Sequence, residues 1–581
     1  MSEVSVPVLV VGGGGCGLAA SIFLSDLGVG HLLVERRATT SALPRAHYLN
    51  QRTMEVFRQH GLAEDVYAVS APLENIGEVV WRTSLAGDGP LDARDLHRMD
   101  SFGGGSTAAP YAEDSPGPST NLPQHRLEPL LLRHATERAP GSLRFNHVME
   151  GFTQDDSGVT ALVTDRVTGE STTVRAQYLV AADGGRSVGT RLGVSMVGDG
   201  GAFNVISVHF SADLSAHWPG DKVLITNFVS PDGGRISRYG MVAMGPDWGL
   251  ASQEWALHFH LPVGVTPETD DASVTATVRE LLKLPDLDVT VHKVSQYIPE
   301  AVIADTFRVG RVFLAGDAAH RHPPATGLGL NSAVQDAHNL AWKLAAVVGG
   351  HAGEGLLDTY EPERRAVAER NVPWAMYAFR NHAVAHAGLG LFPGQPPEAT
   401  KANFEALFSE TPMGETRRVR AAEVFRTQRV EYQAHDIEIG IAYPEGAFVP
   451  DGTPPPPLDP MGAEHHPVTI PGHRLPHAWL DPGEQVSSHD LVGAHGGFAL
   501  ITGTSDGAWA VAAKQAADAL GVPIAVAPVA TGRWARVRGV DDGGAVLVRP
   551  DNHVAWRSGA DGPDRLTDVL RRVLAHQSTG S

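Results

Sequence analysis

The stretch VPVLVVGGGGCGLAASIFLSDLGVGHLLVE, residues 6–35, decides the fold of the first part of the chain. An apolar, β-rich run at 6–11 is followed by a glycine turn at 12–17. The apolar residues of 18–28 recur with helical spacing, and 31–35 is a second β-rich run. The order strand, tight turn, helix, strand predicts a βαβ unit.

The glycine turn matches the pattern G-x-G-x-x-G through Gly12, Gly14 and Gly17, and Glu35 ends the next strand. This is the context that a dinucleotide site requires, although a plain βα turn is the alternative. Gly12 permits the tight turn, Gly14 lets a pyrophosphate approach the backbone, and Gly17 lets helix and strand pack closely. The helix N-terminus favours phosphate, and Glu35 can accept hydrogen bonds from a ribose. The motif leaves NAD and FAD both open.

The composition narrows the class of protein. The 581 residues suffice for roughly three to four domains. A formal net charge of −20 opposes nonspecific binding to nucleic acid or to anionic lipid. The single cysteine excludes an intrachain disulfide, and we find neither a signal peptide nor a run of about 18 apolar residues. We therefore expect a cytoplasmic protein with no nucleic-acid or membrane partner.

Local patterns organise the rest of the chain. Segment 76–120 is rich in Gly, Ser, Pro and Asp and is predicted to be a long loop or lid. Alternating runs across 200–300 predict a mostly antiparallel sheet with one buried face. Prolines across 449–476 predict an extended connector. Helices are predicted at 128–139 and 332–348, further strands at 145–182, and a small α/β unit after residue 498.

Two further motifs place an aspartate at the end of an apolar strand: Asp183 in AADGGRS and Asp317 in GDAAHRHPP. Asp317, His320 and His322 together raise the alternative of a metal site. Histidines two residues apart point to opposite faces of an extended segment, whereas helical ligand pairs stand at i and i+4. No third ligand is placed, so we predict no metal and expect His320 to form a hydrogen bond beside a cofactor.

The motifs GGGGCG, AADGGRS and RVFLAGDAAHRHPP occur in this order, together with PRAHYLNQRTMEVFRQHGL and NLPQHRLEPLLL. In this combination the chain resembles the group A flavoprotein aromatic hydroxylases, the para-hydroxybenzoate hydroxylase superfamily, over about residues 5–380. It is most similar to the phenol and 2,4-dichlorophenol monooxygenase branch, and hydroxylases of aromatic polyketides share the layout.

The resemblance implies an α/β fold in which a Rossmann-like FAD-binding domain is interleaved with a mostly antiparallel substrate sheet. It also implies a C-terminal thioredoxin-like domain, here without a C-x-x-C pair, which serves stability or assembly. We expect a homodimer. The expected boundaries are 1–190 and 301–395 for the FAD-binding domain, 191–300 for the substrate domain, 396–484 for a helix and proline-rich connector, and 485–581 for the thioredoxin-like domain.

The resemblance also implies the chemistry. NADPH or NADH reduces FAD, O2 adds at flavin C4a, and the resulting hydroperoxide hydroxylates a phenolic or hydroxylated heteroaromatic ring. A hydroxylase of aromatic polyketides, a non-oxygenating flavin dehydrogenase and a protein that sequesters an aromatic ligand are the alternatives. The substrate itself, the ring position and the choice between NADH and NADPH stay open.

The resemblance assigns site residues one by one. Asp317 is expected to meet ribityl or ribose hydroxyls, and the backbone N–H groups of 327–331 are expected to face the flavin ring and stabilise its reduced anion. The basic residue usual after the AADGG motif is Thr190 here, and Arg191 is the substitute. The expected cofactor residues are Gly12, Gly14, Gly15, Cys16, Gly17, Glu35, Arg36, Arg45, Gln124, Asp183, Asp317, Pro324, Gly327, Gly329, Leu330 and Asn331.

On the substrate side, His47 takes the place of an aspartate that lies near the phenol in phenol hydroxylases. A histidine there can accept a phenolic proton near neutral pH, and the alternative is a polar side chain that fills space under the flavin. Arg235, Arg238 and Tyr239 lie in the predicted sheet and are candidates to hydrogen-bond a phenol. The expected catalytic set is His47, Arg238 and Tyr239.

Overall fold

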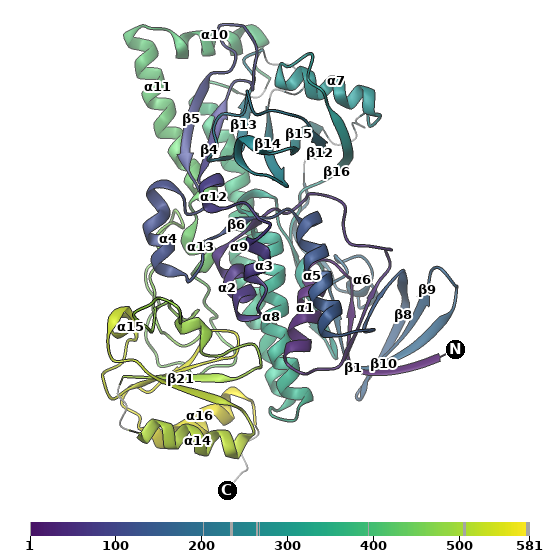
Figure 1. Cartoon of the computed structure of the whole chain (residues 1–581), viewed down its shortest axis with the longest axis vertical. Helices are drawn as coiled ribbons and strands as arrows, with labels where there is room; N and C mark the ends of the chain where they lie inside the picture. Colours follow the sequence, from purple (N-terminus) through teal and green to yellow (C-terminus); the bar gives the residue numbers. More distant parts are fainter. Residues whose placement is uncertain are drawn as a thin grey trace.

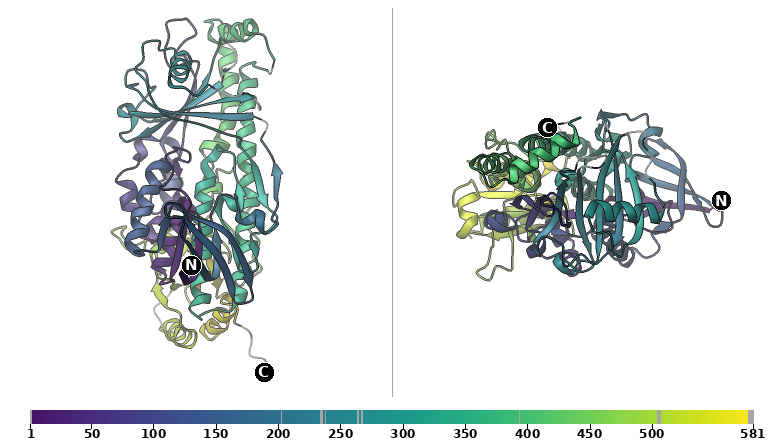
Figure 2. Two further views of the ribbon diagram at one scale, coloured as in Figure 1. Left: turned by 90° about the vertical axis from the view of Figure 1, so that its right-hand side faces the viewer. Right: turned by 90° about the horizontal axis from the view of Figure 1, so that it is seen from above.

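The computed structural model describes residues 2–576 except 202, 233–235, 237, 263–264, 266–267, 393 and 504–506. The molecule is elongated, with a seven-stranded sheet at one end, an eight-stranded sheet beside the middle, and the C-terminal part at the other end (Figure 1). Helices α8 (Leu328–Val348) and α9 (Tyr360–Gly388) run along the long axis (Figure 2). No described helix combines the length and apolarity needed to cross a bilayer.

Strand β1 (Ser2–Val11) lies inside the eight-stranded sheet, whose main path is β18-β19-β10-β1-β2-β7. It pairs in parallel with β2 (His31–Glu35) and with β10 (Ser171–Ala181). Helix α1 (Gly15–Asp26) connects β1 to β2, so the predicted βαβ unit is confirmed, although the helix begins inside the glycine turn. The other strands are β7 (Leu143–Phe145), β8 (His147–Asp155), β9 (Gly158–Asp165), β18 (Arg308–Val309) and β19 (Val312–Leu314).

The seven-stranded sheet has the order β16-β12-β15-β14-β13-β4-β5. Its buried side chains form a hydrophobic core with those of the helices that pack on it. Its strands from 200–300 pair antiparallel with one another, as predicted. Helix α7 (Asp271–Leu282) contributes to this core. The strands are β12 (Phe203–Ser211), β13 (Val223–Val229), β14 (Arg238–Gly245), β15 (Glu254–Pro262) and β16 (Thr290–Tyr297).

The prediction of one long loop across 76–120 is wrong. Strand β4 (Glu78–Arg82) pairs in parallel with β13, and β5 (Asp95–Asp100) extends the sheet beyond it. Helix α4 (Ala108–Asp114) follows. Residues 79–81 are buried in the sheet, while most of the glycines and prolines lie between these elements. The average composition of the segment is typical of a loop, and two short strands within it were therefore not predicted.

The remaining helices cover the sheets and connect them. Helix α8 packs against α1, and it begins at Leu328, four residues before the predicted start. Helix α5 starts at Gln124 rather than at 128 and contains Pro129. Other elements are α2 (Gln51–Gln59), α3 (Ala63–Tyr67), α5 (Gln124–Arg138), α6 (Val188–Arg191), α10 (Pro397–Phe408), α11 (Pro412–Phe425), α12 (Arg429–Tyr432), α13 (His435–Ile439), β3 (Tyr48–Leu49), β6 (Thr120–Asn121), β11 (Met196–Asp199), β17 (Ala301–Ala304) and β20 (His320–Arg321).

The C-terminal part follows a connector that forms isolated bridges but no described helix or strand between 440 and 487, in line with the prolines there. Its sheet has the order β22-β21-β23-β24, in which β21 and β22 are parallel and β23 is antiparallel to both neighbours. The elements are β21 (Phe498–Thr502), α14 (Ala508–Leu520), β22 (Ile524–Pro528), α15 (Gly532–Val537), β23 (Ala545–Val548), β24 (Val554–Arg557) and α16 (Leu566–Val573).

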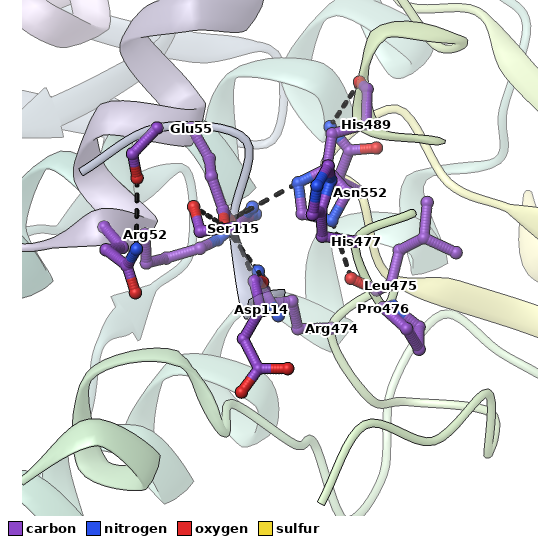
Figure 3. A network of polar contacts seen from close by, with 12 residues as sticks. Arg52, Glu55, Asp114, Ser115, Arg474, Leu475, Pro476, His477, His489 and Asn552 are labelled. Atoms are coloured by element: carbon purple, nitrogen blue, oxygen red, sulfur yellow. Dashed lines mark hydrogen bonds and ion pairs between the residues drawn. The ribbon is translucent and has the colours of Figure 1, made fainter. Parts of the chain in front are cut away.

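A buried ionic network joins this C-terminal part to helix α2 (Figure 3). The Glu55 carboxylate accepts hydrogen bonds from Arg52 Nη1 at 3.1 Å, from Arg474 Nε at 2.9 Å and from Ser115 Oγ at 2.8 Å. His489 Nδ1 lies 3.4 Å from the same carboxylate. Although burial opposes it, Arg474 and His489 hold the pKa of Glu55 well below its usual range. The network therefore depends on an ionised Glu55.

Candidate active site

A cavity of about 1080 Å³ extends from the glycine turn to the seven-stranded sheet. Pockets for one small molecule are roughly 300–1,000 Å³, so this cavity has room for an elongated cofactor and a second ligand. Of the expected site residues, all but Gly17 and Asn331 border it. Those that do are Gly12, Gly14, Gly15, Cys16, Glu35, Arg36, Arg45, His47, Gln124, Asp183, Arg238, Tyr239, Asp317, Pro324, Gly327, Gly329 and Leu330.

The glycine turn has the geometry that the pattern predicts. Gly12 has φ of 112°, and a Cβ there would overlap the carbonyl oxygen of Ala182. A Cβ at Gly17 would overlap the carbonyl oxygen of Gly12. Both positions therefore require glycine, and Gly17 acts through packing, which explains why it does not border the cavity. Helix α1 begins at Gly15 with its N-terminus at the cavity.

Two carboxylates hold the N–H groups of this turn. Gly13 N donates to Glu35 Oε2 at 2.7 Å, and Gly15 N donates to Glu128 Oε1 at 3.1 Å. Glu128 is buried and also accepts a hydrogen bond from Gln124 Nε2 at 2.6 Å. Sequence reasoning missed Glu128, although it stands four residues after Gln124 on the same helical face. The pair ties the start of α5 to the start of α1.

A second helix N-terminus meets the same cavity. Helix α8 begins at Leu328 after Gly327, whose φ is 63°, and no side chain caps it. Asn331 braces this turn, because its Nδ2 donates to the carbonyl oxygens of Gly327 at 2.7 Å and of Tyr48 at 2.9 Å. The positive ends of α1 and α8 thus both favour negative charge in the cavity. Burial raises the pKa of Asp317, which borders the cavity near α8.

The two histidines of GDAAHRHPP lie next to each other, with ring centroids 5.0 Å apart, but their surroundings differ. His320 Nε2 bonds Asp336 Oδ2 at 2.8 Å, and Arg364 Nε bonds Asp336 Oδ1 at 2.7 Å. Burial opposes it, but His320 and Arg364 lower the pKa of Asp336 to about 2. His322 borders the cavity, and burial holds its pKa well below the ordinary value. His320 is therefore engaged in a buried hydrogen bond with Asp336 and does not border the cavity.

A group with metal-ligand character lies elsewhere in the described part of the chain, at His125, His209 and Glu254. His209 Nε2 is 3.0 Å and His125 Nε2 is 3.6 Å from Glu254 Oε2. Arg126 Nη2 also lies 2.9 Å from that oxygen. A permanent cation therefore already compensates the carboxylate at the position where a metal would bind.

His47 borders the cavity and is held by a side chain that the sequence did not single out. Its Nδ1 donates to Asn121 Oδ1 at 2.6 Å, and Asn121 Nδ2 donates to the carbonyl oxygen of Ala243 at 3.4 Å. An amide oxygen can only accept, so the proton of neutral His47 stands on Nδ1 and its Nε2 keeps a lone pair. Burial lowers the pKa of His47, and the hydrogen bond to Asn121 partly opposes this.

Arg238 and Tyr239 have opposite surroundings, because successive side chains of a strand face opposite sides of the sheet. Although Tyr239 borders the cavity, its hydroxyl donates to the carbonyl oxygen of Leu281 on α7, and its ring stacks on Phe228 at 4.7 Å. The Tyr239 hydroxyl proton is therefore already donated within the protein, which argues against the expectation that this group donates to a substrate. Arg235, the other candidate, lies outside the described residues.

The basic side chains near the glycine turn differ from those expected. Arg191 Nη2 donates to the carbonyl oxygen of Glu150 at 2.6 Å and does not border the cavity. Arg186 does border it, with Arg36, Arg37 and Arg45. Burial and these three neighbours lower the pKa of Arg186. The carboxylates of Asp183 and Asp317 border the same section of the wall and act electrostatically on Arg186, so positive and negative side chains face each other there.

Comparisons with known proteins identify the family. Residues 5–375 match the family model described as FAD binding domain, and residues 468–576 match the one described as aromatic-ring hydroxylase, C-terminal. The chain is 35% identical to 2,4-dichlorophenol 6-monooxygenase of Delftia acidovorans, with 98% of each chain covered. It is 37% identical to a putative polyketide hydroxylase of Streptomyces halstedii, with 98% of this chain and 96% of the other covered.

A solved structure extends the likeness to three dimensions. The flavin-dependent monooxygenase PieE, in complex with FAD and substrate, matches with a TM-score of 0.91 and 38% identity over 99% of this chain and 100% of the other. The two family models together cover most of the sequence. The resemblance read from the three motifs is therefore confirmed, and the chain belongs to the FAD-dependent aromatic-ring hydroxylases.

Proposed function

We propose that this protein is a monooxygenase that uses FAD, NAD(P)H and O2 to hydroxylate a phenolic or hydroxylated heteroaromatic ring. The observation that carries the proposal is that one cavity connects the glycine turn and the N-terminus of α8 with the seven-stranded sheet. His47 borders this cavity and is tied to the sheet through Asn121. Cofactor residues and a proton acceptor thus border the same cavity.

The residues present fit FAD. The turn at Gly12 and Gly17 excludes side chains where a pyrophosphate would approach the start of α1, and Glu35 ends β2 beside it. The loop before α8 offers backbone N–H groups and a positive helix end for a reduced, anionic ring. When bound, the flavin supplies electron transfer from the reductant and activation of O2.

Four arginines support docking of a phosphate-bearing reductant. Arg36, Arg37, Arg45 and Arg186 border the cavity, and Arg186 lies in the electrostatic range of the other three. Arginine binds phosphate through a planar fork of N–H donors. We propose that some of these side chains hold the phosphates of NAD(P)H, while the start of α1 serves the FAD pyrophosphate. This assignment replaces the expectation for Arg191.

His47 is the proposed base. Because burial lowers its pKa, His47 is neutral at pH 7, and its Nε2 can accept the proton of a ring hydroxyl. A deprotonated hydroxyl donates more electron density to the ring, which favours attack by an electrophilic oxygen. Arg238, on the cavity face of β14, is the other side chain of the expected catalytic set that stays in this proposal.

The cavity volume favours a substrate larger than a simple phenol. After an elongated cofactor is accommodated, a cavity of about 1080 Å³ retains space next to Trp81, Phe102 and Tyr432. Aromatic side chains of this kind pack against fused rings. A hydroxylated multi-ring compound of polyketide type is therefore the second candidate substrate.

The test uses the FAD-loaded enzyme with phenols, hydroxylated heteroaromatics and fused-ring hydroxyquinones. Each compound is scored for stimulated oxidation of NADPH and NADH and for a product that carries one oxygen atom from ¹⁸O2. We expect both signals for at least one compound. Substrate-stimulated reduction without labelled product supports a flavin dehydrogenase, and binding without turnover supports sequestration; either result rejects the monooxygenase proposal.

We also propose that the C-terminal part has a thioredoxin-like fold. The element order β21-α14-β22-α15-β23-β24-α16 and the sheet order β22-β21-β23-β24 support this. The chain has one cysteine, Cys16, so a role in thiol exchange is excluded and a role in stability or assembly remains. A homodimer stays a prediction, which light scattering of the purified protein tests.

A further inference from the structure

Two histidines and a carboxylate meet outside the cavity, at the junction between the start of α5 and the seven-stranded sheet. His125 is the second residue of α5, His209 lies on β12, and Glu254 is the first residue of β15. Ser211 pairs with Glu254 across the two strands, so His209 and Glu254 lie diagonally on the same face of the sheet. The three side chains do not border the cavity, so they are separate from the cofactor and substrate positions proposed above.

The three potential ligand atoms have the spacing that one metal ion requires. They all lie within 4.8 Å of one another. His209 Nε2 is 3.0 Å and His125 Nε2 is 3.6 Å from Glu254 Oε2. The ligands of a tetrahedral zinc ion, each bonded at about 2.0–2.1 Å, stand about 3.3–3.4 Å apart. The two measured separations bracket this range, so small side-chain movements suffice to place an ion between the three atoms.

His125 is the member of the group that packing does not explain. Its Nδ1 and Nε2 are both shielded from solvent, and neither has a hydrogen-bond partner among the described residues. The separation of 3.6 Å from Glu254 Oε2 is too long for a hydrogen bond. Buried polar atoms normally have a partner, and leaving one unpaired is costly. A metal ion bonded to Nε2 gives this imidazole the partner that the protein alone does not supply.

Arg126 is the feature that opposes a metal ion at this position. Its Nη2 lies 2.9 Å from Glu254 Oε2, and its Nε donates to the carbonyl oxygen of Met244 at 3.1 Å. An ionised carboxylate has about four lone-pair sites, so the bond to Arg126 leaves others for an ion. Hydrogen bonds of this kind orient ligating carboxylates. Arg126 therefore holds Glu254 in place, while its charge lowers the affinity for a second cation.

The carboxylate is in the protonation state that a metal ligand needs. Although burial opposes it, His125, His209 and Arg126 hold the pKa of Glu254 below its ordinary value. Glu254 is therefore ionised, and an ionised carboxylate is the form that binds metal.

We propose that His125 Nε2, His209 Nε2 and the Glu254 carboxylate bind a divalent transition-metal ion, with Zn²⁺ as the ion that this ligand set favours. Two imidazoles and one carboxylate are a set that zinc takes, and they leave its fourth position to water. Calcium and magnesium select oxygen ligands instead. The site goes beyond the proposed hydroxylation, since none of its ligands borders the cavity.

The place of the site in the fold says what the ion restrains. His125 follows Gln124, whose Nε2 donates to Glu128 Oε1, and the same carboxylate oxygen accepts the N–H of Gly15. An ion that ties His125 to β12 and β15 therefore fixes the helix start that supports the glycine turn. The metal acts as a clamp between the two sheets of the protein.

The experiment titrates the untagged, FAD-loaded full chain with Zn²⁺ alone, without reductant or aromatic compound. Equilibrium dialysis with metal analysis by mass spectrometry gives the stoichiometry and the affinity, and X-ray absorption at the zinc edge identifies the ligands. We expect one saturable ion per chain, with two imidazole nitrogens at about 2.0–2.1 Å. His125→Gln and His209→Gln should each weaken binding by at least about 10- to 100-fold, because even the loss of an indirect partner of a ligand has that effect.

His292→Gln is the matched control. Its ring centroid lies 4.9 Å from that of His209, but its Nε2 is already bonded to Ser211 Oγ at 2.6 Å. This variant should bind zinc like the wild type. His125→Gln decides the question even if His209→Gln does not fold, because His125 has no hydrogen bond to lose among the described residues.

Three results overturn the proposal. The first is a wild type that retains no zinc up to about 1 mM free metal. The second is a folded, FAD-loaded His125→Gln that binds zinc as tightly as the wild type, which means adventitious surface binding only. The third is equal weakening by His292→Gln and His125→Gln, which removes the ligand assignment. None of these results depends on turnover, so the proposed hydroxylation stands or falls separately.

Discussion

Replacing Arg474 with methionine should destabilise the whole protein, because it removes the main partner of a buried carboxylate. Arg474 contacts both oxygens of Glu55 and also donates from Nη2 to the carbonyl oxygen of Asp114 at 2.7 Å. Two charged hydrogen bonds at about 1.5–3 kcal/mol each give about 3–6 kcal/mol. Breaking a buried ion pair by removing one partner costs about 3–5 kcal/mol, which agrees. We therefore expect Arg474→Met to lower the free energy of unfolding by about 3–5 kcal/mol.

The assay is urea unfolding of the FAD-loaded protein, followed by far-UV circular dichroism, with a double-mutant cycle. The double variant Glu55→Gln, Arg474→Met should lose less than the sum of the two single variants, because it leaves no uncompensated carboxylate. The control is Lys514→Met, which removes a cation that is 77% exposed and paired with Asp518 on the surface of α14. The control should unfold like the wild type.

Two outcomes would refute this reasoning. One is a decrease of less than about 1 kcal/mol in the free energy of unfolding for Arg474→Met, which would mean that the other partners of Glu55 suffice to stabilise its buried charge. The other is strict additivity in the cycle, which would mean that the two side chains do not interact. A pH series adds a check. The pKa of Glu55 is lower in the folded than in the unfolded protein. The stabilisation that ionised Glu55 contributes is therefore complete above the pKa of the unfolded state. It is lost as the pH falls through the pKa of the folded state.

Three further predictions concern the cavity. Gly17→Ala should abolish FAD retention, measured as flavin absorbance per purified chain, because the added Cβ overlaps Gly12; normal flavin content would contradict the turn geometry. His47→Gln should lower kcat by about 100- to 10,000-fold if His47 is the base, whereas a space-filling role predicts little change. Activity should fall as pH drops through the lowered pKa of His47, and Asn121→Asp should move that acid limb to higher pH by placing a carboxylate on Nδ1; an unmoved limb rejects the assignment. Arg186→Met should raise KM for NAD(P)H with little change in kcat, and an unchanged KM would remove Arg186 from the reductant site.

The sequence predicted those parts of the fold whose pattern is local. The βαβ unit was recognised because its strand, turn and helix are contiguous, and Gly12 and Gly17 are needed for the reasons that the pattern implies. Strands β4 and β5 were missed because each is short and glycine-rich segments surround them. Their identity is decided by pairing with β13, which lies far away in the sequence.

Site residues were predictable where a motif names them and not where only folding brings them together. Glu128 reaches Gly15 across 113 positions, and Asn121 reaches His47 across 74. Alternation indicates that Arg238 and Tyr239 face opposite sides of a strand, but it does not tell whose polar group is already bonded within the protein. That depends on α7, whose Leu281 carbonyl accepts the Tyr239 hydroxyl.

The position of β1 has a consequence for how the protein is made. Its partner on one side, β2, leaves the ribosome almost at once, but its partner on the other side, β10, ends at Ala181, and β19 ends only at Leu314. At about 5–20 residues per second, an apolar strand edge stays open for roughly 10 s or more during translation. The nascent chain needs protection over this interval, and capture of the flavin must wait until the loop before α8 has been synthesised.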